Sequence, residues 1–206
     1  MKQPLNLTAE LVPLAYVEAL LELAQTFGVN REALFAAAQV KPQVLQHPNG
    51  RVSFFDFSLL ASAALQACQE PALGLLLGQR LNVSSHGILG YAVLASANLG
   101  QAIQFALKYY RVLGLAFDLE LIEHPECLEL RAIESMPMGP LARFAAEGLL
   151  ASLYSIARFL LGTDLQGLAV GFAHAAPSYA ERYREIFGVA ALFEQPWHSL
   201  SMPKRY

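Results

Sequence analysis

The spacing of hydrophobic residues changes between the two halves of this chain, and that change limits the fold more than any other feature. Up to Leu113 the apolar residues recur every three or four positions, which is the period of an α-helix with one buried face. From Phe117 the segment FDLELIE alternates apolar and acidic residues, which is the period of a half-buried strand. We therefore expect an α+β fold, in which a helix-rich N-terminal part precedes an antiparallel sheet of about five strands covered by helices.

Residues 1–82 are expected to form a helical subregion without strands. Residues that favour helix starts or ends stand at each expected boundary. Residues 41–51, which contain two prolines and an Asn-Gly pair, are predicted to be a surface loop with His47 as a solvated side chain. The expected helices are one capped by Thr8 and ending at Phe27 and Gly28, one over 31–38 capped by Asn30, one opened by Ser53 and running through Cys68, and one opened by Pro71 and ending near Leu81.

Residues 83–206 are expected to combine helices with the sheet. Residues 84–97 fit a strand or a helix by spacing, and we favour a helix because 99–113 continues with helical periodicity. A turn at 124–126 would join two strands into a hairpin whose acidic face is solvated. The remaining elements are a long helix over 139–161 ended by Gly162, a strand over 167–175, a helix over 179–187 ended by Gly188, and two short strands within 190–202.

The composition indicates a large core and argues against nucleic-acid binding by this chain alone. Hydrophobic residues make up 55% of the 206 residues and charged residues only 15%, whereas average domains have about 25% charged residues. The 14 lysines and arginines and the net charge of −3 provide no basic surface to neutralise a phosphate backbone. Cys68 and Cys127 are outside any paired motif, so we expect two buried, reduced side chains.

We expect a cytoplasmic protein that does not contact a membrane. The N-terminal residues lack the long apolar segment and the cleavage pattern of a signal peptide. Residues 141–161 are long enough to cross a bilayer, but Arg143, Glu147 and Arg158 would be costly in hydrocarbon.

No catalytic or metal-binding motif is present in the sequence. It has no phosphate-binding loop, nucleophile elbow or zinc-protease motif, and its five histidines are dispersed without a pair at helical spacing. We therefore expect neither an enzyme, nor a metal, nor a cofactor. An alternative is a hydrolase that uses His86 or His174, although no nucleophile with a recognisable setting accompanies them.

Aromatic and polar residues within the apolar segments are candidates for a ligand pocket between helices and sheet. Glu147, Ser155 and Arg158 fall close to one stripe of the long helix, where an arginine could bind a ligand carboxylate. A solvated face or an internal ion pair also explains this stripe, and the aromatic residues could simply be core. The candidate ligand-binding residues are His86, Tyr91, Phe105, Tyr109, Tyr110, Phe117, Phe144, Tyr154, Arg158, Phe172 and His174.

An ordered series of motifs resembles one known family. Residues 73–81 (LGLLLGQRL), 84–96 (SSHGILGYAVLAS) and 99–103 (LGQAI) are followed by FAHAAP at 172–177, Tyr183-Arg184-x-x-Phe187-Gly188 and LSMP at 200–203. This series resembles the N-terminal effector-binding domain of AraC/XylS-type transcription regulators, in the subgroup with an arabinose-binding-like domain. The resemblance covers most of the chain, so we expect residues 1–206 to be one effector-binding and dimerisation domain.

The resemblance implies a small-molecule effector and a homodimer. Family members continue into two helix-turn-helix motifs, whereas this chain ends at Tyr206, so we expect a sensor domain whose DNA contacts are made by an absent C-terminal domain. The effector could be an amino acid, a polyamine, an organic acid or a fatty acid. Because such domains diverge most at their pockets, the resemblance assigns no ligand residues. A dimerisation module without a ligand is the alternative.

Overall fold

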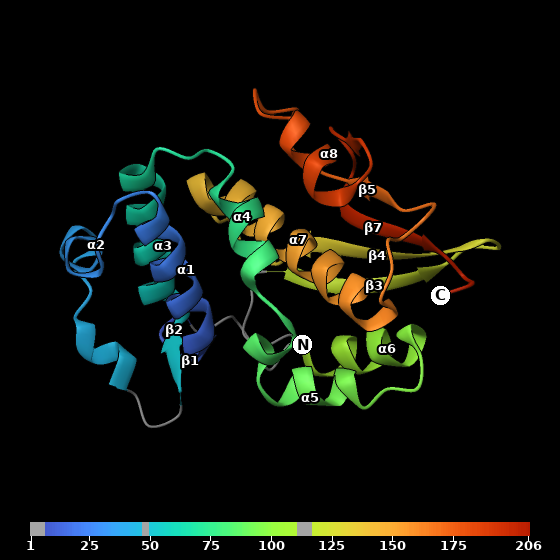
Figure 1. Cartoon of the computed structure of the whole chain (residues 1–206), viewed down its shortest axis with the longest axis horizontal. Helices are drawn as coiled ribbons and strands as arrows, with labels where there is room; N and C mark the ends of the chain where they lie inside the picture. The colour runs from blue at the N-terminus through green and yellow to red at the C-terminus, as the bar shows by residue number, and fades with distance from the viewer. Residues whose placement is uncertain (1–6, 47–49, 111–116) are drawn as a thin grey trace. The chain divides into compact units, whose positions relative to one another are not determined.

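The computed structural model describes residues 7–46, 50–110 and 117–206, and the chain divides into two compact units (Figure 1). The first unit comprises Met1–Glu70 and Tyr110–Leu115, and the second comprises Pro71–Tyr109 and Ala116–Tyr206. Helices and a five-stranded sheet together make the fold α+β, as expected. The predicted loop residue His47 lies outside the described residues.

The first unit packs three helices beside a small two-stranded sheet. The prediction that this region has no strands is wrong, because Glu10–Pro13 (β1) pairs with Arg51–Ser53 (β2). Val12 is β-branched and precedes a proline, which disfavours helical backbone at that position. The helix predicted to start after Thr8 therefore starts only at Leu14. The elements of this unit are β1, α1 (Leu14–Thr26), α2 (Arg31–Ala38), η1 (Pro42–Gln46), β2 and α3 (Phe54–Cys68).

Two of the predicted helix caps in this unit are confirmed. The Asn30 side chain accepts a hydrogen bond from the backbone N–H of Ala33 at 2.7 Å. The Ser53 hydroxyl accepts from the N–H of Asp56 at 3.0 Å and donates to its carboxylate at 2.7 Å. These bonds satisfy N–H groups that have no partner within their own helix.

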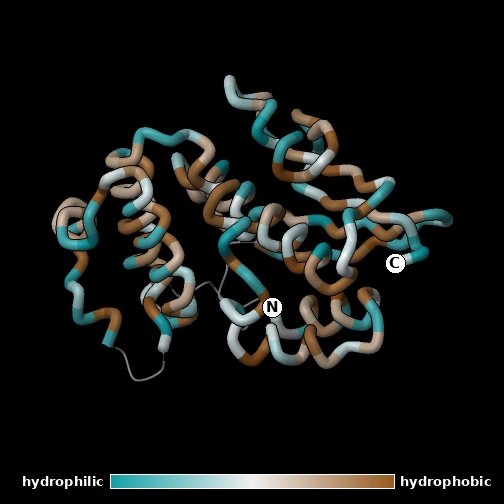
Figure 2. Tube along the Cα trace, in the orientation of Figure 1, coloured by the Kyte–Doolittle hydropathy of each residue, from teal (hydrophilic) through white to brown (hydrophobic). Residues whose placement is uncertain are grey.

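The second unit carries the larger sheet and the longest helix. Its predicted long helix is confirmed and ends at Gly162, which has a left-handed φ of 64°. The turn between β3 and β4 is hydrophilic, as the hairpin prediction requires (Figure 2). The elements are α4 (Leu73–Arg80), η2 (Val83–His86), α5 (Ile88–Leu94), α6 (Leu99–Tyr110), β3 (Phe117–Glu123), β4 (Cys127–Glu134), η4 (Gly139–Leu141), α7 (Ala142–Leu161), β5 (Ala169–Gly171), α8 (Glu181–Phe187), β6 (Ala191–Leu192) and β7 (His198–Pro203).

The main sheet has the expected number of strands but is mixed and not purely antiparallel. Its order is β3-β4-β7-β5-β6, and β5 and β6 run parallel, with Val170 opposite Ala191. The connection between these two strands contains α8, and parallel neighbours need such a crossover. β5 is also shorter than predicted; Val170 within it and Phe172 just after it are fully buried, and Ala169 is exposed.

Helix α7 packs closely against α4 through small residues. A Cβ added at Gly78 would lie 2.5 Å from the carbonyl oxygen of Gly148 in α7, so only glycine permits this approach. The segment Gly139–Leu161 is long and apolar enough to cross a membrane, and half of its most apolar window is buried inside the structure, as in a core helix.

The two cysteines are free, as predicted, but they are half-buried and not buried. Cys68 is the last residue of α3 and Cys127 is the first residue of β4. Side chains at the ends of elements border turns, and turns lie at the surface.

Candidate functional site

A carboxylate is buried in the middle of α7. Glu147 has no solvent exposure. Its Oε1 accepts hydrogen bonds from the hydroxyls of Tyr179 at 2.6 Å and Tyr183 at 2.5 Å, both from the region of α8. Its Oε2 has no side-chain hydrogen-bond partner among the described residues, and the carboxylate is approached by the backbone N–H of Leu75 in α4. Buried carboxylates are rare unless paired, so this one requires a structural or functional explanation.

Burial raises the pKa of Glu147 from 4.5 to about 7, because the charged form loses its hydration. The hydrogen bonds from Tyr179 and Tyr183, the charge of Arg143 and the backbone N–H of Leu75 each oppose this rise. Burial and the carboxylate also raise the pKa of both tyrosines, so they stay protonated and keep donating. Glu147 is therefore the group of this cluster that changes charge near neutral pH.

A guanidinium lies one helical turn before the carboxylate. Arg143 is exposed at the start of α7, and a hydrogen bond with Tyr179 raises its pKa. The Tyr179 hydroxyl thus contacts Arg143 on one side and Glu147 on the other. This arrangement connects a surface cation to a buried carboxylate through one hydroxyl.

Aromatic rings pack around Phe172, next to the hydrogen bonds of Glu147, in what we call the Phe172 cluster. Phe172 is fully buried, and five rings lie within 6.2 Å of its centroid. The nearest are Tyr183 at 4.9 Å in an edge-on arrangement and His174 at 5.1 Å. Such ring pairs stabilise a core beyond the area they bury. The Phe172 cluster comprises Phe172, His174, Tyr183, Phe187, Phe193 and His198.

The two histidines of the cluster are neutral. Burial lowers the pKa of both, that of His198 to about 4. His198 Nδ1 accepts a hydrogen bond from the N–H of Ala173. His174 Nδ1 lies 3.0 Å from the carbonyl of Ala175 and must donate to it, which leaves His174 Nε2 as an acceptor. That atom is buried and has no partner among the described residues.

Another buried polar contact joins α7 to η2. The Ser152 hydroxyl lies 3.3 Å from His86 Nε2 and 3.3 Å from the carbonyl of Leu81. Burial lowers the pKa of His86 to about 4, so this imidazole is neutral at physiological pH.

The predicted ligand residues do not all fall in one place. Phe172 and His174 are in the Phe172 cluster, and Phe117 and Tyr154 contact its rim through His198 and Phe187. Phe144, Phe105 and Tyr110 are buried or half-buried in α7 and α6, and His86 lies in η2. Tyr91 is exposed on α5. The side chain of Tyr109 lies outside the described residues.

The stripe of Glu147, Ser155 and Arg158 is not an internal ion pair. Glu147 is fully buried, whereas Arg158 is exposed and pairs with Asp164 at 2.8 Å. Tyr179 and Tyr183 were not predicted from the sequence as partners of Glu147. Their spacing of four residues was the available signal, because it would put two hydroxyls on one face of the helix predicted over 179–187.

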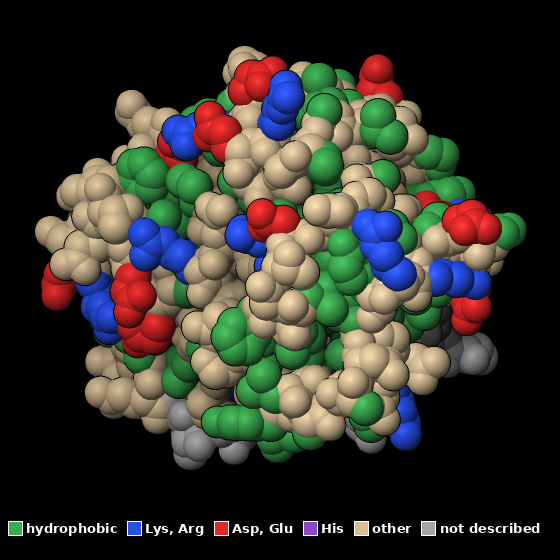
Figure 3. Space-filling view, turned by 45° about the vertical axis from the view of Figure 1, so that its right-hand side comes forward, with side chains coloured by type: hydrophobic (Ala, Val, Ile, Leu, Met, Phe, Trp, Pro, Cys, Tyr) green, Lys and Arg blue, Asp and Glu red, His purple; other side chains and the backbone are tan. Residues whose placement is uncertain are grey.

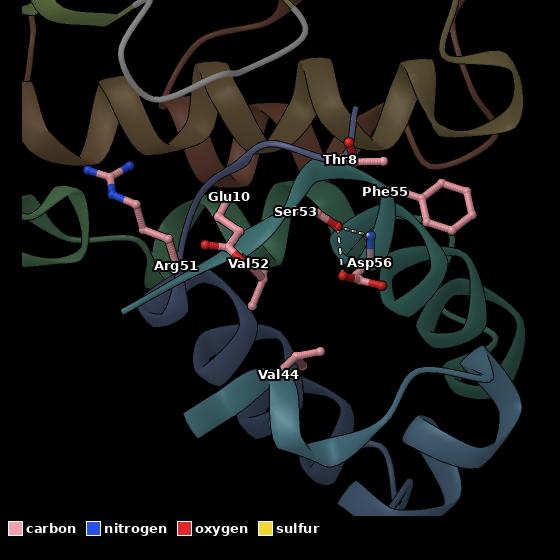
Figure 4. Close-up of a pocket in the computed structure, with 8 residues that line it drawn as sticks. All are labelled: Thr8, Glu10, Val44, Arg51, Val52, Ser53, Phe55 and Asp56. Atoms are coloured by element: carbon pink, nitrogen blue, oxygen red, sulfur yellow. Dashed lines mark hydrogen bonds between the residues drawn. The ribbon is translucent and has the colours of Figure 1, made fainter. Parts of the chain in front are cut away.

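The first unit contains a groove of about 290 Å³ between its small sheet, η1 and the start of α3 (Figure 4). Three of its polar side chains have partners within the unit: Arg51 donates to the carbonyl of Leu11 at 2.6 Å, and Ser53 and Asp56 bond to each other. Arg51 and Phe55 point away from the space above Val44 (Figure 4). Arg51, Ser53 and Asp56 therefore already have hydrogen-bond partners. Its lining residues are Thr8, Glu10, Val44, Arg51, Val52, Ser53, Phe55 and Asp56.

Within the described ranges, no group of three or more His, Cys, Asp or Glu side chains could hold a metal ion. In the second unit, the buried acceptors Glu147 Oε2 and His174 Nε2 lie among aromatic residues.

Comparison with known proteins identifies the family. Residues 28–206 match the model of the arabinose-binding domain of AraC transcription regulators, N-terminal part. The chain belongs to this family. The resemblance inferred from the sequence motifs is thereby confirmed.

Individual relatives of this AraC-family domain are transcription regulators. The chain is 68% identical, over all 206 residues, to the ornithine utilization regulator of Pseudomonas aeruginosa, and it spans 61% of that protein's length. It is 24% identical over 112 residues to an HTH-type transcriptional regulator of Mycobacterium tuberculosis, covering 54% of this chain and 33% of that protein. The crystal structure of the transcriptional regulator CdpR from Pseudomonas aeruginosa shares the fold, with a TM-score of 0.58 at 16% identity, covering 89% of this chain and 54% of that one.

Proposed function

We propose that this chain is the effector-sensing domain of an AraC-type regulator and that its effector is L-ornithine or a similar basic amino acid. The observation that carries this proposal is the 68% identity, across the whole chain, to a regulator named for ornithine utilization. The buried acceptors Glu147 Oε2 and His174 Nε2 support it, because an ammonium group supplies the donors that such acceptors need. Residues 1–206 would act together as one effector-binding domain.

The role we propose is regulatory and not enzymatic, in the cytoplasm. A sensor must bind its effector with different affinities in two states. DNA contacts would come from a DNA-binding domain elsewhere in the regulator, since this domain spans 61% of its ornithine-related relative and carries a net charge of −3.

We also propose that this domain forms a homodimer through the outer face of α5. Ile88, Tyr91 and Leu94 have exposed fractions of 86%, 68% and 46% on this short helix. No lysine, arginine, aspartate or glutamate occurs between Arg80 and Lys108. A neutral apolar face fits a second copy of itself, because no unpaired charge opposes the contact. Hydrophobic side chains also gather along the lower edge of the surface in Figure 3.

A thermal-shift panel tests the effector class. We expect L-ornithine to raise the melting temperature in a dose-dependent way, and L-glutamate, L-leucine and L-arabinose to leave it unchanged at equal concentration, because a ligand that binds only the native state stabilises it. An equal shift with L-glutamate would contradict the basic effector class. No shift with any basic amino acid, for a chain shown to be folded, would contradict the proposed effector.

A further inference from the structure

Two hydrogen-bond acceptors in the second unit, Glu147 Oε2 and His174 Nε2, are buried without side-chain donors among the described residues. A backbone donor, the N–H of Leu75, approaches the Glu147 carboxylate from α4, and the ring of His174 lies 6.2 Å from that of Tyr183, which donates to Glu147. The charge of Arg143 affects the pKa of both Glu147 and His174, which places one guanidinium within electrostatic reach of the two acceptors. A ligand that satisfies them must bring hydrogen-bond donors. An ammonium group brings three and no acceptor.

The surroundings of these acceptors suit a cation with an aliphatic stem. Tyr183, a member of the Phe172 cluster, donates a hydrogen bond to the Glu147 carboxylate and packs edge-on against Phe172. Aromatic faces attract ammonium groups, and this attraction is stronger where water is excluded. A charged carboxylate that is buried without a counter-charge is costly, and a cation beside it removes part of that cost.

The opposite charge of an amino acid also has a partner here. Arg143 is exposed at the start of α7, one turn before Glu147, and its guanidinium contacts the Tyr179 hydroxyl. Guanidinium groups bind carboxylates in a bidentate geometry. The network therefore presents a cation at the surface and a carboxylate below it, the arrangement that a diamino acid requires for its two ends.

We propose that the side-chain ammonium of the effector binds Glu147 and His174 beside the Phe172 cluster, while its α-carboxylate binds Arg143. This inference rests on the proposed function, because it assigns a place to the basic effector named there. Tyr179 is the half-exposed residue that contacts both Arg143 and Glu147, so the effector would lie beside its hydroxyl. Since Glu147 contacts the α8 region and lies against Gly74 of α4, occupancy would act on helices on both sides of α7.

The test compares L-ornithine with L-norvaline, which has the same carbon chain but lacks the side-chain amine. We expect the wild-type chain to bind ornithine about 10- to 100-fold more tightly in calorimetric titrations, the range for a hydrogen bond to a charged group. Glu147→Gln should bind the two ligands with nearly equal affinity. Glu181→Gln, which changes an exposed carboxylate in α8, is the matched control and should keep the preference.

Three outcomes separate the two claims. If the wild-type chain binds neither ligand, the proposed function fails and this inference fails with it. If the wild-type chain prefers ornithine and Glu147→Gln keeps that preference, the function stands and this inference is overturned. If Glu147→Gln loses the preference while Glu181→Gln keeps it, the inference is supported.

A measurement on the wild-type chain covers the case in which Glu147→Gln does not fold. The ornithine-to-norvaline affinity ratio should rise between pH 6 and pH 8, because Glu147 becomes charged over this range while the α-groups of the two ligands titrate alike. We expect a rise of several-fold. A ratio that stays constant over this range would overturn the inference.

Discussion

The two units of this chain use their polar side chains in different ways. In the first unit, Ser53 and Asp56 lie three residues apart in sequence and cap a helix through bonds to each other, and Asp56 is half-buried. In the second unit, Glu147 is fully buried and takes its donors from residues 32 and 36 positions away. A cap satisfies the backbone of its own helix. The Glu147 carboxylate is not needed for its own helix and is bonded to tyrosines that are distant in sequence. For this reason we place the effector in the second unit.

The largest expected effect is on the packing of α4 against α7. A Cβ at Gly74 would lie 2.4 Å from the carbonyl oxygen of Phe144 and 2.8 Å from Glu147 Oε2. Gly74→Ala should therefore lower the free energy of unfolding by about 3 kcal/mol, as overpacking does. Urea denaturation measures the change.

Gly100→Ala in α6 is the matched control, because its new Cβ would meet only Asn98 Oδ1 at 3.4 Å. Replacing glycine by alanine inside a helix should stabilise by up to about 1 kcal/mol. Equal effects of the two substitutions would show that α4 and α7 do not pack as closely as described.

The second prediction concerns the pH dependence of stability. The pKa of Glu147 is about 7 in the folded chain and 4.5 without burial, so the folded state binds more protons between these values. Wild-type stability should therefore fall, relative to Glu147→Gln, by roughly 2–3 kcal/mol from pH 4.5 to pH 7. Denaturant midpoints across this range measure the difference.

The histidines with lowered pKa act in the opposite direction. His86 and His198 reduce the stability of the folded chain as the pH falls below 6.5, their pKa without burial. They are present in both proteins, so their contribution cancels in the difference. A stability difference that does not vary with pH would mean that Glu147 does not titrate in this range.

A smaller effect is expected at the outer face of α5. Tyr91→Glu should raise the dissociation constant of the homodimer at least about tenfold, because two copies would bring unpaired carboxylates together in an apolar contact. Light scattering across a concentration series measures it, with Gln104→Glu on the exposed side of α6 as a control. A wild-type chain that is monomeric throughout would contradict the dimer, and an unchanged constant would contradict only the choice of α5.

The smallest effect belongs to the first unit. Ser53→Ala removes the cap of α3 and should cost about 1 kcal/mol of unfolding free energy. Ornithine affinity should stay within twofold, because we place the effector in the second unit. A large loss of affinity in a stable Ser53→Ala chain would move the site to the groove in Figure 4.

Local signals in the sequence predicted much of the fold. The caps at Asn30 and Ser53, the end of α7 at Gly162 and the hairpin of β3 and β4 each depend on neighbouring residues, and all are confirmed. The strand β1 was missed because its pairing with β2 lies 40 residues away, and the parallel pairing of β5 and β6 depends on the path of the chain through α8.

The candidate site was harder to predict for the same reason. Phe172 and His174 were predicted as ligand residues because they are aromatic or polar residues within an apolar segment, and the structure places them in one aromatic cluster. The link from Glu147 to Tyr179 and Tyr183 joins segments that no local pattern relates. Spacing identified the stripe of Glu147 and Arg158 on α7, but only tertiary packing determines that the first is buried and the second exposed.

A crystal structure of the chain grown with L-ornithine would test the central claim most directly. Our account predicts ornithine in the second unit, with its side-chain nitrogen within hydrogen-bond distance of the Glu147 carboxylate and its α-carboxylate on Arg143. Ornithine bound in the groove of the first unit, or in the second unit with its amine away from Glu147, would contradict it.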